Sequence, residues 1–315
     1  MHVHLDLVGG IAGDMFLAAA IDAGLVDVVE LEAGLRTLGL GAELTIRTEH
    51  TRRGAIAGTR VWFADWDPSA DADHRHLSTI EQMISDSELA EGVKARAIAL
   101  FNVLGAAESK IHDIPMERVH FHEVGAVDSI LDFVSAAWIL ESLDATWSFG
   151  SVPTGRGMIE TAHGTIPVPA PATAEMLAGM RLVQRDVEME LVTPTGAAIL
   201  ASLDATELRR DGALRGIGYG CGTRDPAALS NVVRMMAFDD TAGATTGWQT
   251  ERIASARLLP ALTCCPRTTT ACWCGCAWTT WAGRSRCPSR CCPRVRARGR
   301  STRSRRWSAG ASPRT

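Results

Sequence analysis

The sequence has no uninterrupted apolar run of about 18 residues, so we expect no membrane-spanning helix. It also lacks the basic start and apolar stretch of a signal peptide, which makes the cytoplasm the expected location. It contains no G-x-S-x-G motif, and Cys221 has no base close to it in the sequence, so a covalent hydrolase is not indicated. With 46% hydrophobic and 22% charged residues among 315, the composition is that of a soluble globular protein.

Acidic residues are missing from one end of the chain and dominate the rest. Residues 257–315 hold 13 of the 32 basic residues, all Arg, and no acidic residue. This leaves 19 basic against 36 acidic residues, a net charge of −17, before residue 257. Because nucleic-acid binding needs a basic surface, we expect no nucleic-acid partner for the body of the protein. An acidic body suits a protein that handles cations.

The last part of the chain also differs in its other residue types. Eight of the nine Cys lie at residues 264–292, and residues 257–315 contain no Ile, Met, Phe or His. These Cys do not form the C-x₂-C pairs of zinc sites, and no amphipathic period is present. An Arg-rich binding arm is an alternative, but translation in a shifted frame of a GC-rich gene explains the missing residue types best. We therefore predict a domain at 1–250, as one unit or two subdomains, and an unstructured tail at 251–315.

Along residues 2–238, segments in which every second residue is apolar are interspersed with segments in which apolar residues recur at helical spacing. Ser78 and Glu81 have the spacing of a helix-capping box, and residues 218–222 have the composition of a glycine-rich turn. The mixture predicts an α/β or α+β fold, with a mixed sheet and packed helices, whose strand order stays open. We expect strands at 2–8, 43–50, 56–66, 147–168 and 214–238, and helices at 14–24, 27–38, 77–85, 88–110, 128–143, 167–178 and 193–203.

The densest group of metal-binding residue types lies between residues 119 and 132. In an extended segment, His120 and His122 share a face, so both imidazoles can point at one ion. Imidazole suits Ni²⁺, Cu²⁺ and Zn²⁺, and the carboxylates of Glu123 and Asp128 can complete the coordination or orient the rings. This pattern predicts a metal site. The alternative is that Asp128 caps the following helix and the histidines are ordinary polar residues beside a loop.

A second candidate site follows the first predicted strand. Gly10 and Gly13, with Asp14 after them, resemble a turn whose N–H groups and helix N-terminus cradle a phosphate. A simple tight turn, with Asp14 favoured by the helix dipole, explains the same residues equally well. Asp6, on the preceding strand, is a further candidate for binding a cation.

Two more segments have fixed backbone shapes that suit a binding site. His163 lies in a loop whose Gly and Pro restrict its conformation, and such loops often carry sites. Thr193, Thr195 and Gly196 open a predicted helix, where hydroxyl and N–H groups suit phosphate; helix capping by Thr195 is the alternative.

Two further pairs of histidines have simple explanations that involve no metal site. His2 and His4 have metal-ligand spacing but occupy a terminus that we expect to be mobile, so we interpret the pair as incidental. His74 and His76 suit an anionic ligand or, slightly better, a solvated loop.

Several of these segments together resemble the nickel-insertion proteins of nickel-pincer cofactor biosynthesis, the LarC family. The matching stretches occur in the order found in that family and cover about residues 3–238. They are Asp6-x-x-x-Gly10-Ile11-x-Gly13-Asp14-Met15, His120-Phe121-His122-Glu123-Val124-Gly125-Ala126-x-Asp128-Ser129-Ile130, Ala162-His163-Gly164-x-x-Pro167-x-Pro169-Ala170-Pro171-Ala172, Thr193-Pro194-Thr195-Gly196-Ala197-Ala198 and Gly218-Tyr219-Gly220-x-Gly222.

The resemblance implies a nickel chelatase. It would place Ni²⁺ into pyridinium-3,5-bisthiocarboxylic acid mononucleotide, between two thiocarboxylate sulfurs and a ring carbon, with hydrolysis of CTP bound with Mg²⁺ or Mn²⁺. It also implies a homo-oligomer and a downstream pincer-dependent enzyme similar to lactate racemase. His120 and His122 would hold Ni²⁺ loosely enough to pass it to the softer sulfur ligands. The family's acidic C-terminal domain, associated with nucleotide binding and assembly, is replaced here by the Arg- and Cys-rich tail.

Three functions therefore remain open at this point. The first is nickel insertion, either complete or limited to nickel binding. The limited form would apply if this chain is an unshifted product, because in some relatives the C-terminal domain is reached through a ribosomal frameshift. The second is non-catalytic nickel storage or transport, which the acidic body also permits. The third is a zinc-dependent hydrolase built on His120, His122 and Asp128.

Overall fold

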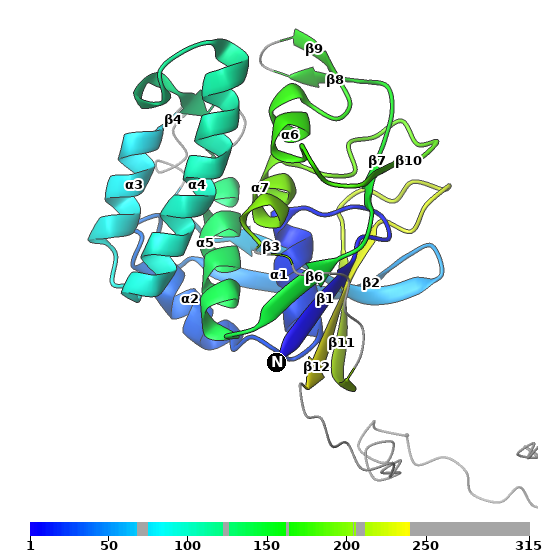
Figure 1. Cartoon of the computed structure of the whole chain (residues 1–315). Coiled ribbons are helices and arrows are strands. Elements are labelled where there is room, and N and C mark those ends of the chain that lie inside the picture. The colour runs from blue at the N-terminus through cyan, green and yellow to red at the C-terminus, as the bar shows by residue number, and fades with distance from the viewer. Residues whose placement is uncertain (68–74, 122–125, 162–163, 204, 206–211, 240–315) are drawn as a thin grey trace, which may run out of the picture. The chain divides into compact units, whose positions relative to one another are not determined.

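A computed structural model of the protein describes residues 1–67, 75–121, 126–161, 164–203, 205 and 212–239, and of His120 the backbone alone. The predicted tail at 251–315 lies outside the described residues, so the division into domain and tail stays a prediction. The described residues build one mixed sheet with packed helices, as the sequence predicts (Figure 1).

The central sheet has six strands in the order β2-β3-β11-β12-β1-β6. The pairs β1–β6 and β3–β11 are parallel, and the pairs β1–β12, β11–β12 and β2–β3 are antiparallel. Strands β1, β3, β6 and β11 therefore point in one direction. Their bounds are β1 His2–Asp6, β2 Thr45–Arg53, β3 Ile56–Ala64, β6 Thr146–Phe149, β11 Ala213–Cys221 and β12 Val232–Asp239.

Helix α1 packs on β3, β11 and β12 and also contacts α5 and α7. In Figure 1, it lies between the strands and the adjacent helices α4 and α5. Apolar side chains at helical spacing fill the layer between them, among them the fully buried Phe16, Phe101 and Phe133. The helices are α1 Gly13–Asp22, α2 Val28–Arg36, α3 Leu77–Asp86, α4 Glu91–His112, α5 Val127–Ser142, α6 Pro171–Met176 and α7 Pro194–Ser202.

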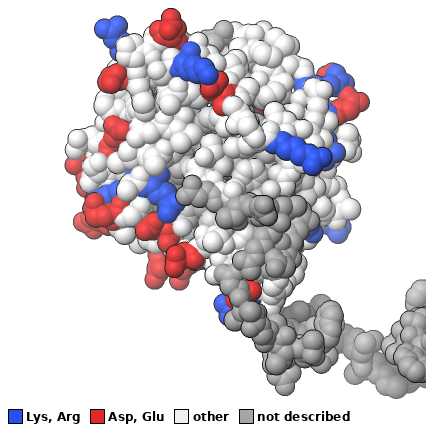
Figure 2. Space-filling model, viewed as in Figure 1, with Lys and Arg blue, Asp and Glu red and all other residues white. Residues whose placement is uncertain are grey.

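Three small sheets and a 3₁₀ turn complete the described part of the chain. The small sheets pair β4 with β5, β7 with β10 and β8 with β9. Their bounds are β4 Arg75–His76, β5 His120–Phe121, β7 Val152–Thr154, β8 Met158–Thr161, β9 Gly164–Pro167 and β10 Leu182–Gln184, and the 3₁₀ turn is Met116–Arg118. On the face shown in Figure 2, acidic and basic side chains are intermixed. None of the helices in the described ranges has the length and hydrophobicity needed to cross a bilayer.

The expectation that His2 and His4 lie on a mobile terminus is wrong. Both side chains are fully buried, because β1 is an inner strand between β12 and β6. The Ser148 hydroxyl lies 2.8 Å from His2 Nε2 and 2.8 Å from His4 Nδ1, and Thr146 Oγ1 lies 2.8 Å from His2 Nδ1. The two imidazoles therefore serve as polar links between β1 and β6.

The glycine-rich turn expected at residues 218–222 is also wrong, since β11 continues through Cys221. Glycine is needed there for a different reason, namely the close approach of α1. A Cβ on Gly218 would lie 2.0 Å from the Ala19 carbonyl oxygen, and one on Gly220 would lie 1.9 Å from that of Met15. Glycine inside a strand marks such an approach of another backbone segment.

The expected helix caps need correction as well. Helix α3 begins at Leu77, and its N-cap His76 makes no side-chain capping bond, so Ser78 and Glu81 form no capping box. Thr193, rather than Thr195, caps α7 by accepting a hydrogen bond from the Gly196 N–H.

The packing of α1 on β11 can be tested by adding one methyl group. Gly220→Ala should lower the free energy of unfolding by about 2 kcal/mol or more, because the helix has to move away from the strand. Gly216→Ala is the matched control on the same strand, since its Cβ would lie 3.3 Å from the nearest atom, the Ala23 carbonyl oxygen. A loss of about 1 kcal/mol or less is expected for it. Urea unfolding measures both, and equal midpoints would contradict this packing.

Candidate functional site

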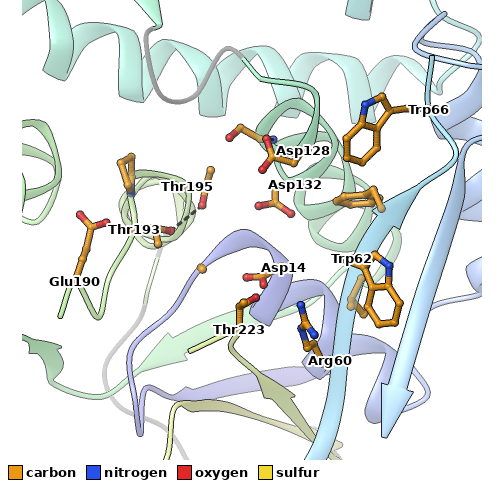
Figure 3. Close-up of a pocket in the computed structure, with 15 residues that line it drawn as sticks. Asp14, Arg60, Trp62, Trp66, Asp128, Asp132, Glu190, Thr193, Thr195 and Thr223 are labelled. Carbon is orange, nitrogen blue, oxygen red and sulfur yellow. Dashed lines mark hydrogen bonds between the residues drawn. The ribbon is translucent and has the colours of Figure 1, made fainter. Parts of the chain in front are cut away.

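A pocket of about 600 Å³ opens at the carboxyl ends of β1, β3 and β11 (Figure 3). At these ends the chain continues into α1 and into the loops that follow β3 and β11. Ligands of α/β proteins commonly bind at the carboxyl ends of parallel strands. The first turns of α1, α5 and α7 form one side of the pocket, and β3 with the segment that follows it forms the other. Strand β3 pairs with β11 through Thr59, whereas residues 60–63, further along β3, line the pocket.

Three aspartates from two helices meet in this pocket. Asp14 lies in the first turn of α1, where its Oδ1 accepts a hydrogen bond from the Met15 N–H at 2.7 Å. Asp128 and Asp132 are one turn apart on α5 and therefore project from the same side of that helix. Asp128 does not cap α5, since Ala126 is the N-cap residue. Its Oδ1 accepts a hydrogen bond from the Ser129 N–H at 2.8 Å.

Gly13 allows these carboxylates to approach one another. A Cβ on Gly13 would lie 2.5 Å from both Cβ and Cγ of Asp132, so no other residue fits at this point of contact between α1 and α5. The glycine that the sequence predicts for a phosphate-binding turn is thus required for helix packing as well.

The surroundings of Asp14 and Asp132 make the ionisation of these two carboxyl groups costly. Burial raises the pKa of Asp14 from 3.8 to about 6, with the Met15 N–H and Arg60 opposing the rise and Asp128 adding to it. Burial also raises the pKa of Asp132 well above its usual range, and the Asp14 and Asp128 carboxylates add to this rise. Perturbed carboxylates that line one pocket are a common feature of functional sites.

The start of α7 closes the pocket beside α1. The Thr193 and Thr195 hydroxyls lie 2.8 Å apart, and Thr195 Oγ1 accepts a hydrogen bond from the Gly13 N–H at 3.2 Å. A Cβ on Gly10, whose φ is +110°, would lie 1.7 Å from the Leu191 carbonyl oxygen, and one on Gly196 would lie 2.2 Å from that of Ile11. The two glycine turns predicted to bind phosphate are thus packed against each other. Their binding of phosphate stays a prediction.

Aromatic side chains and one arginine form the opposite wall of the pocket. Trp62, Phe63 and Trp66 line it together with Arg60. The Arg60 guanidinium carbon lies 5.3 Å from the centre of the Trp62 ring, a cation–π contact, and Nη1 lies 3.8 Å from Glu49 Oε2. These four residues were not among the predicted site residues, because the sequence around them has an ordinary strand pattern.

The other predicted site residues fall into two groups. Asp6 is not part of the pocket lining; its Oδ2 accepts a hydrogen bond from Arg234 Nε at 2.8 Å, and its Oδ1 lies 3.2 Å from His4 Nε2. The backbone of His120 pairs with that of His76 in the β4–β5 sheet. The remaining predicted residues, His122, Glu123 and His163, lie outside the described residues. Among those described, no three carboxylate, imidazole or thiol side chains are placed to hold a metal ion by themselves.

Comparison with known proteins matches residues 3–257 to the family described as nickel insertion protein. A putative nickel insertion protein of Rhodopirellula baltica is 40% identical over 79% of this chain and 62% of its own length. A putative nickel insertion protein of Geobacter metallireducens is 44% identical over 76% and 62% of the two chains. The pyridinium-3,5-bisthiocarboxylic acid mononucleotide nickel insertion protein of Staphylococcus epidermidis is 41% identical over 75% and 59%.

The match covers about three-fifths of the length of these relatives. No solved structure matches the chain. The motifs on which the resemblance rests supply Asp14, Asp128, Thr193 and Thr195 to one pocket, although they are far apart in the sequence. The family match spans all of these motifs, and the relatives are 40–44% identical over three-quarters or more of this chain. The chain belongs to the nickel insertion protein family.

Proposed function

We propose that this chain inserts Ni²⁺ into pyridinium-3,5-bisthiocarboxylic acid mononucleotide, and that the pocket between α1, α5, α7 and β3 is where the two meet. The observation that carries this proposal is the convergence of Asp14, Asp128 and Asp132 in a pocket that three of the motifs help to line. A relative at 41% identity is named for this reaction. A volume of about 600 Å³ lies within the usual range for small-molecule sites.

The charge balance of the pocket favours a divalent cation. Among the described residues that line it, Arg60 is the one basic residue, against the three aspartates and Glu190. A cation between the aspartates would relieve their mutual repulsion and lower the raised pKa values of Asp14 and Asp132. Ni²⁺ is the cargo of the reaction here, so it has to be bound and then released.

Incomplete coordination by the described residues agrees with such a transfer. Because they supply no complete metal site, further ligands have to come from elsewhere. We propose that His120, His122 and Glu123, in the segment that leads into α5, supply them before transfer. The two thiocarboxylate sulfurs of the substrate replace them afterwards, since sulfur is a softer ligand for nickel than carboxylate or imidazole.

A second compartment is suited to the phosphate of the mononucleotide. A pocket of about 210 Å³ shares Asp14 and Thr193 with the larger one and is also lined by Arg224 and Asn231. The loop that carries Arg224 is fixed, because Asn231 Nδ2 donates a hydrogen bond to the Arg224 carbonyl oxygen at 2.9 Å. Arg53 Nε donates to the Gly222 carbonyl oxygen at 2.6 Å. Because these two hydrogen bonds hold the loop in place, we assign the phosphate of the mononucleotide to the guanidinium group of Arg224.

The proposal also includes CTP with Mg²⁺ or Mn²⁺, a homo-oligomeric state and a recipient enzyme similar to lactate racemase. The direct test mixes the full chain with Ni²⁺ and the thiocarboxylate mononucleotide, with and without CTP and Mg²⁺, and follows the nickel-containing product by mass spectrometry. Product formation supports insertion. Tight nickel binding without product in either mixture would indicate storage, and zinc-dependent hydrolysis of the mononucleotide would indicate a hydrolase.

The nickel ligands can be tested by equilibrium dialysis. Asp128→Asn and the double variant His120→Ala with His122→Ala should each weaken Ni²⁺ binding by about tenfold or more, while the fold stays intact. Glu91→Gln is the matched control, because Glu91 also lies in the first turn of a helix but outside the pocket. If stoichiometry and affinity are unchanged in both site variants, nickel binds elsewhere.

The pKa of Asp14 predicts a pH-dependent cost in stability. In the folded protein Asp14 titrates at about 6, against 3.8 in the unfolded chain, so the folded state holds the extra proton between these values. Stability therefore falls as the pH rises through this window, and the full cost is present above it. Asp14→Asn removes this cost and should raise the melting temperature at about pH 7.5, by roughly 2–4 °C per kcal/mol recovered.

Near the unfolded value of 3.8, the melting temperatures of Asp14→Asn and the parent protein should nearly coincide. Differential scanning calorimetry across this range measures the difference, with Glu91→Gln again as the control. An equal gain at all pH values would show that the variant acts through packing and not through the carboxylate charge.

A further inference from the structure

The two walls of the large pocket have opposite chemistry. The wall from α1 and α5 presents carboxylates, and the wall from β3 and the segment after it presents indole rings (Figure 3). Trp66 is drawn on the strand side opposite Asp128 and Asp132. A flat ligand between these walls would contact an aromatic face on one side and negative charge on the other.

The position of Trp66 is fixed by the residue before it. Asp65 follows the end of β3 with a φ of +61°, in the left-handed region, which turns the chain sharply after the strand. Its Oδ2 accepts hydrogen bonds from the Thr45 hydroxyl and from Arg47 Nη2, both at 2.8 Å. The Arg47 guanidinium keeps the pKa of Asp65 below its usual value, so this carboxylate stays ionised and bonded near neutral pH.

A glycine contact fixes the backbone on the other side of Trp66. A Cβ on Gly41 would lie 2.9 Å from Trp66 Cα and 2.6 Å from the Asp67 nitrogen. The Asp67 N–H donates a hydrogen bond to the Leu40 carbonyl oxygen at 2.9 Å. Trp66 is thus held from both sides, and its partly buried ring packs against the hydrophobic core.

The two tryptophans differ in what already covers them. Arg60 lies over the Trp62 ring, whereas no basic side chain of the described residues makes such a contact with Trp66. Trp66 therefore offers an aromatic face to a cationic ligand from outside the chain. Aromatic faces attract cations through their quadrupole, and nearby carboxylates add a Coulomb attraction that a neutral ring would not receive.

We propose that Trp66 is the stacking platform for the ring of the substrate, and that the facing carboxylates make the pocket selective for a positively charged heteroaromatic ring. This assignment rests on the proposed function, since the pyridinium ring of the mononucleotide is such a cation. It makes Trp66 a specificity-determining residue, with Asp65 and Gly41 as positioning residues for it.

The test compares two probes that differ by one N-methyl group and one charge, 1-methylnicotinamide and nicotinamide. Calorimetric titration of the full chain should give binding of the cation about tenfold or more tighter than of the neutral ring. Trp66→Ala should weaken binding of the cation by about tenfold, and Trp66→Phe should retain most of it. A charge-transfer absorption band between indole and pyridinium should appear with the parent protein and disappear in both Trp66 variants.

Trp138→Phe is the matched control, because Trp138 packs against Gly34 and Leu89 outside this pocket. It should leave both the affinity and the absorption band unchanged. Equal affinity for the two probes would overturn the charge selectivity, and unchanged binding by Trp66→Ala would overturn the stacking role. Asp128→Asn should reduce the preference for the cation, and an unaltered preference would remove the carboxylates from the selectivity.

The outcome can be separated from that of the proposed function, because neither probe contains sulfur or needs nickel. Selective, Trp66-dependent binding together with absent nickel insertion would sustain the ring platform and contradict the insertion activity of this chain. Nickel insertion that is insensitive to Trp66→Ala would sustain the activity and contradict the platform.

Discussion

The contact between Gly13 and Asp132 determines how the pocket is built. It brings the first turn of α1 against the second turn of α5, so that Asp14, Asp128 and Asp132 gather where no basic residue of the two helices lies between them. Protein interiors rarely keep several carboxylates together unless they are paired or bind a cation. The folding energy for this arrangement comes from the apolar layer around Phe16, and the three aspartates do not add to it.

The family's motifs are therefore not separate binding loops. The segments at Gly10 and Gly196 pack against the backbones of Leu191 and Ile11 and join the end of β1 to the start of α7. This join holds one side of the pocket rigid. The aromatic wall on the other side depends on local turn geometry at Asp65. A rigid acidic side and a separately positioned aromatic side together form the pocket in which we propose that a cation and a flat ring bind.

Much of the fold could be predicted from the sequence, because period-2 and period-3.6 patterns are local. The strand before Gly10, the hairpin around Gly54 and the helix after Asp128 lie where the patterns indicate. The wrong predictions concern residues whose surroundings are set by tertiary contacts, which a local pattern does not contain. The glycines of β11 have the composition of a turn, but they are needed because α1 packs closely on the strand. His2 was expected on a mobile terminus, but its strand lies inside the sheet between β12 and β6. Of the residues that line the pocket, Asp14 and Thr193 belong to the sequence motifs, whereas Trp66 and Arg60 reach the pocket only through the packing of β3 and the turn after it.

The buried polar links of β1 have one further consequence. His2 lies directly opposite Thr146, His4 opposite Ser148 and Asp6 opposite Arg234. Each of these facing pairs is joined side chain to side chain, and the Ser148 hydroxyl also contacts His2. A slip of one residue would bring apolar side chains opposite these polar ones and leave buried donors and acceptors unmatched. The ladder thus specifies a single alignment of three strands. Since the loop after β1 leads into α1, the same alignment fixes the point from which the chain approaches Asp14.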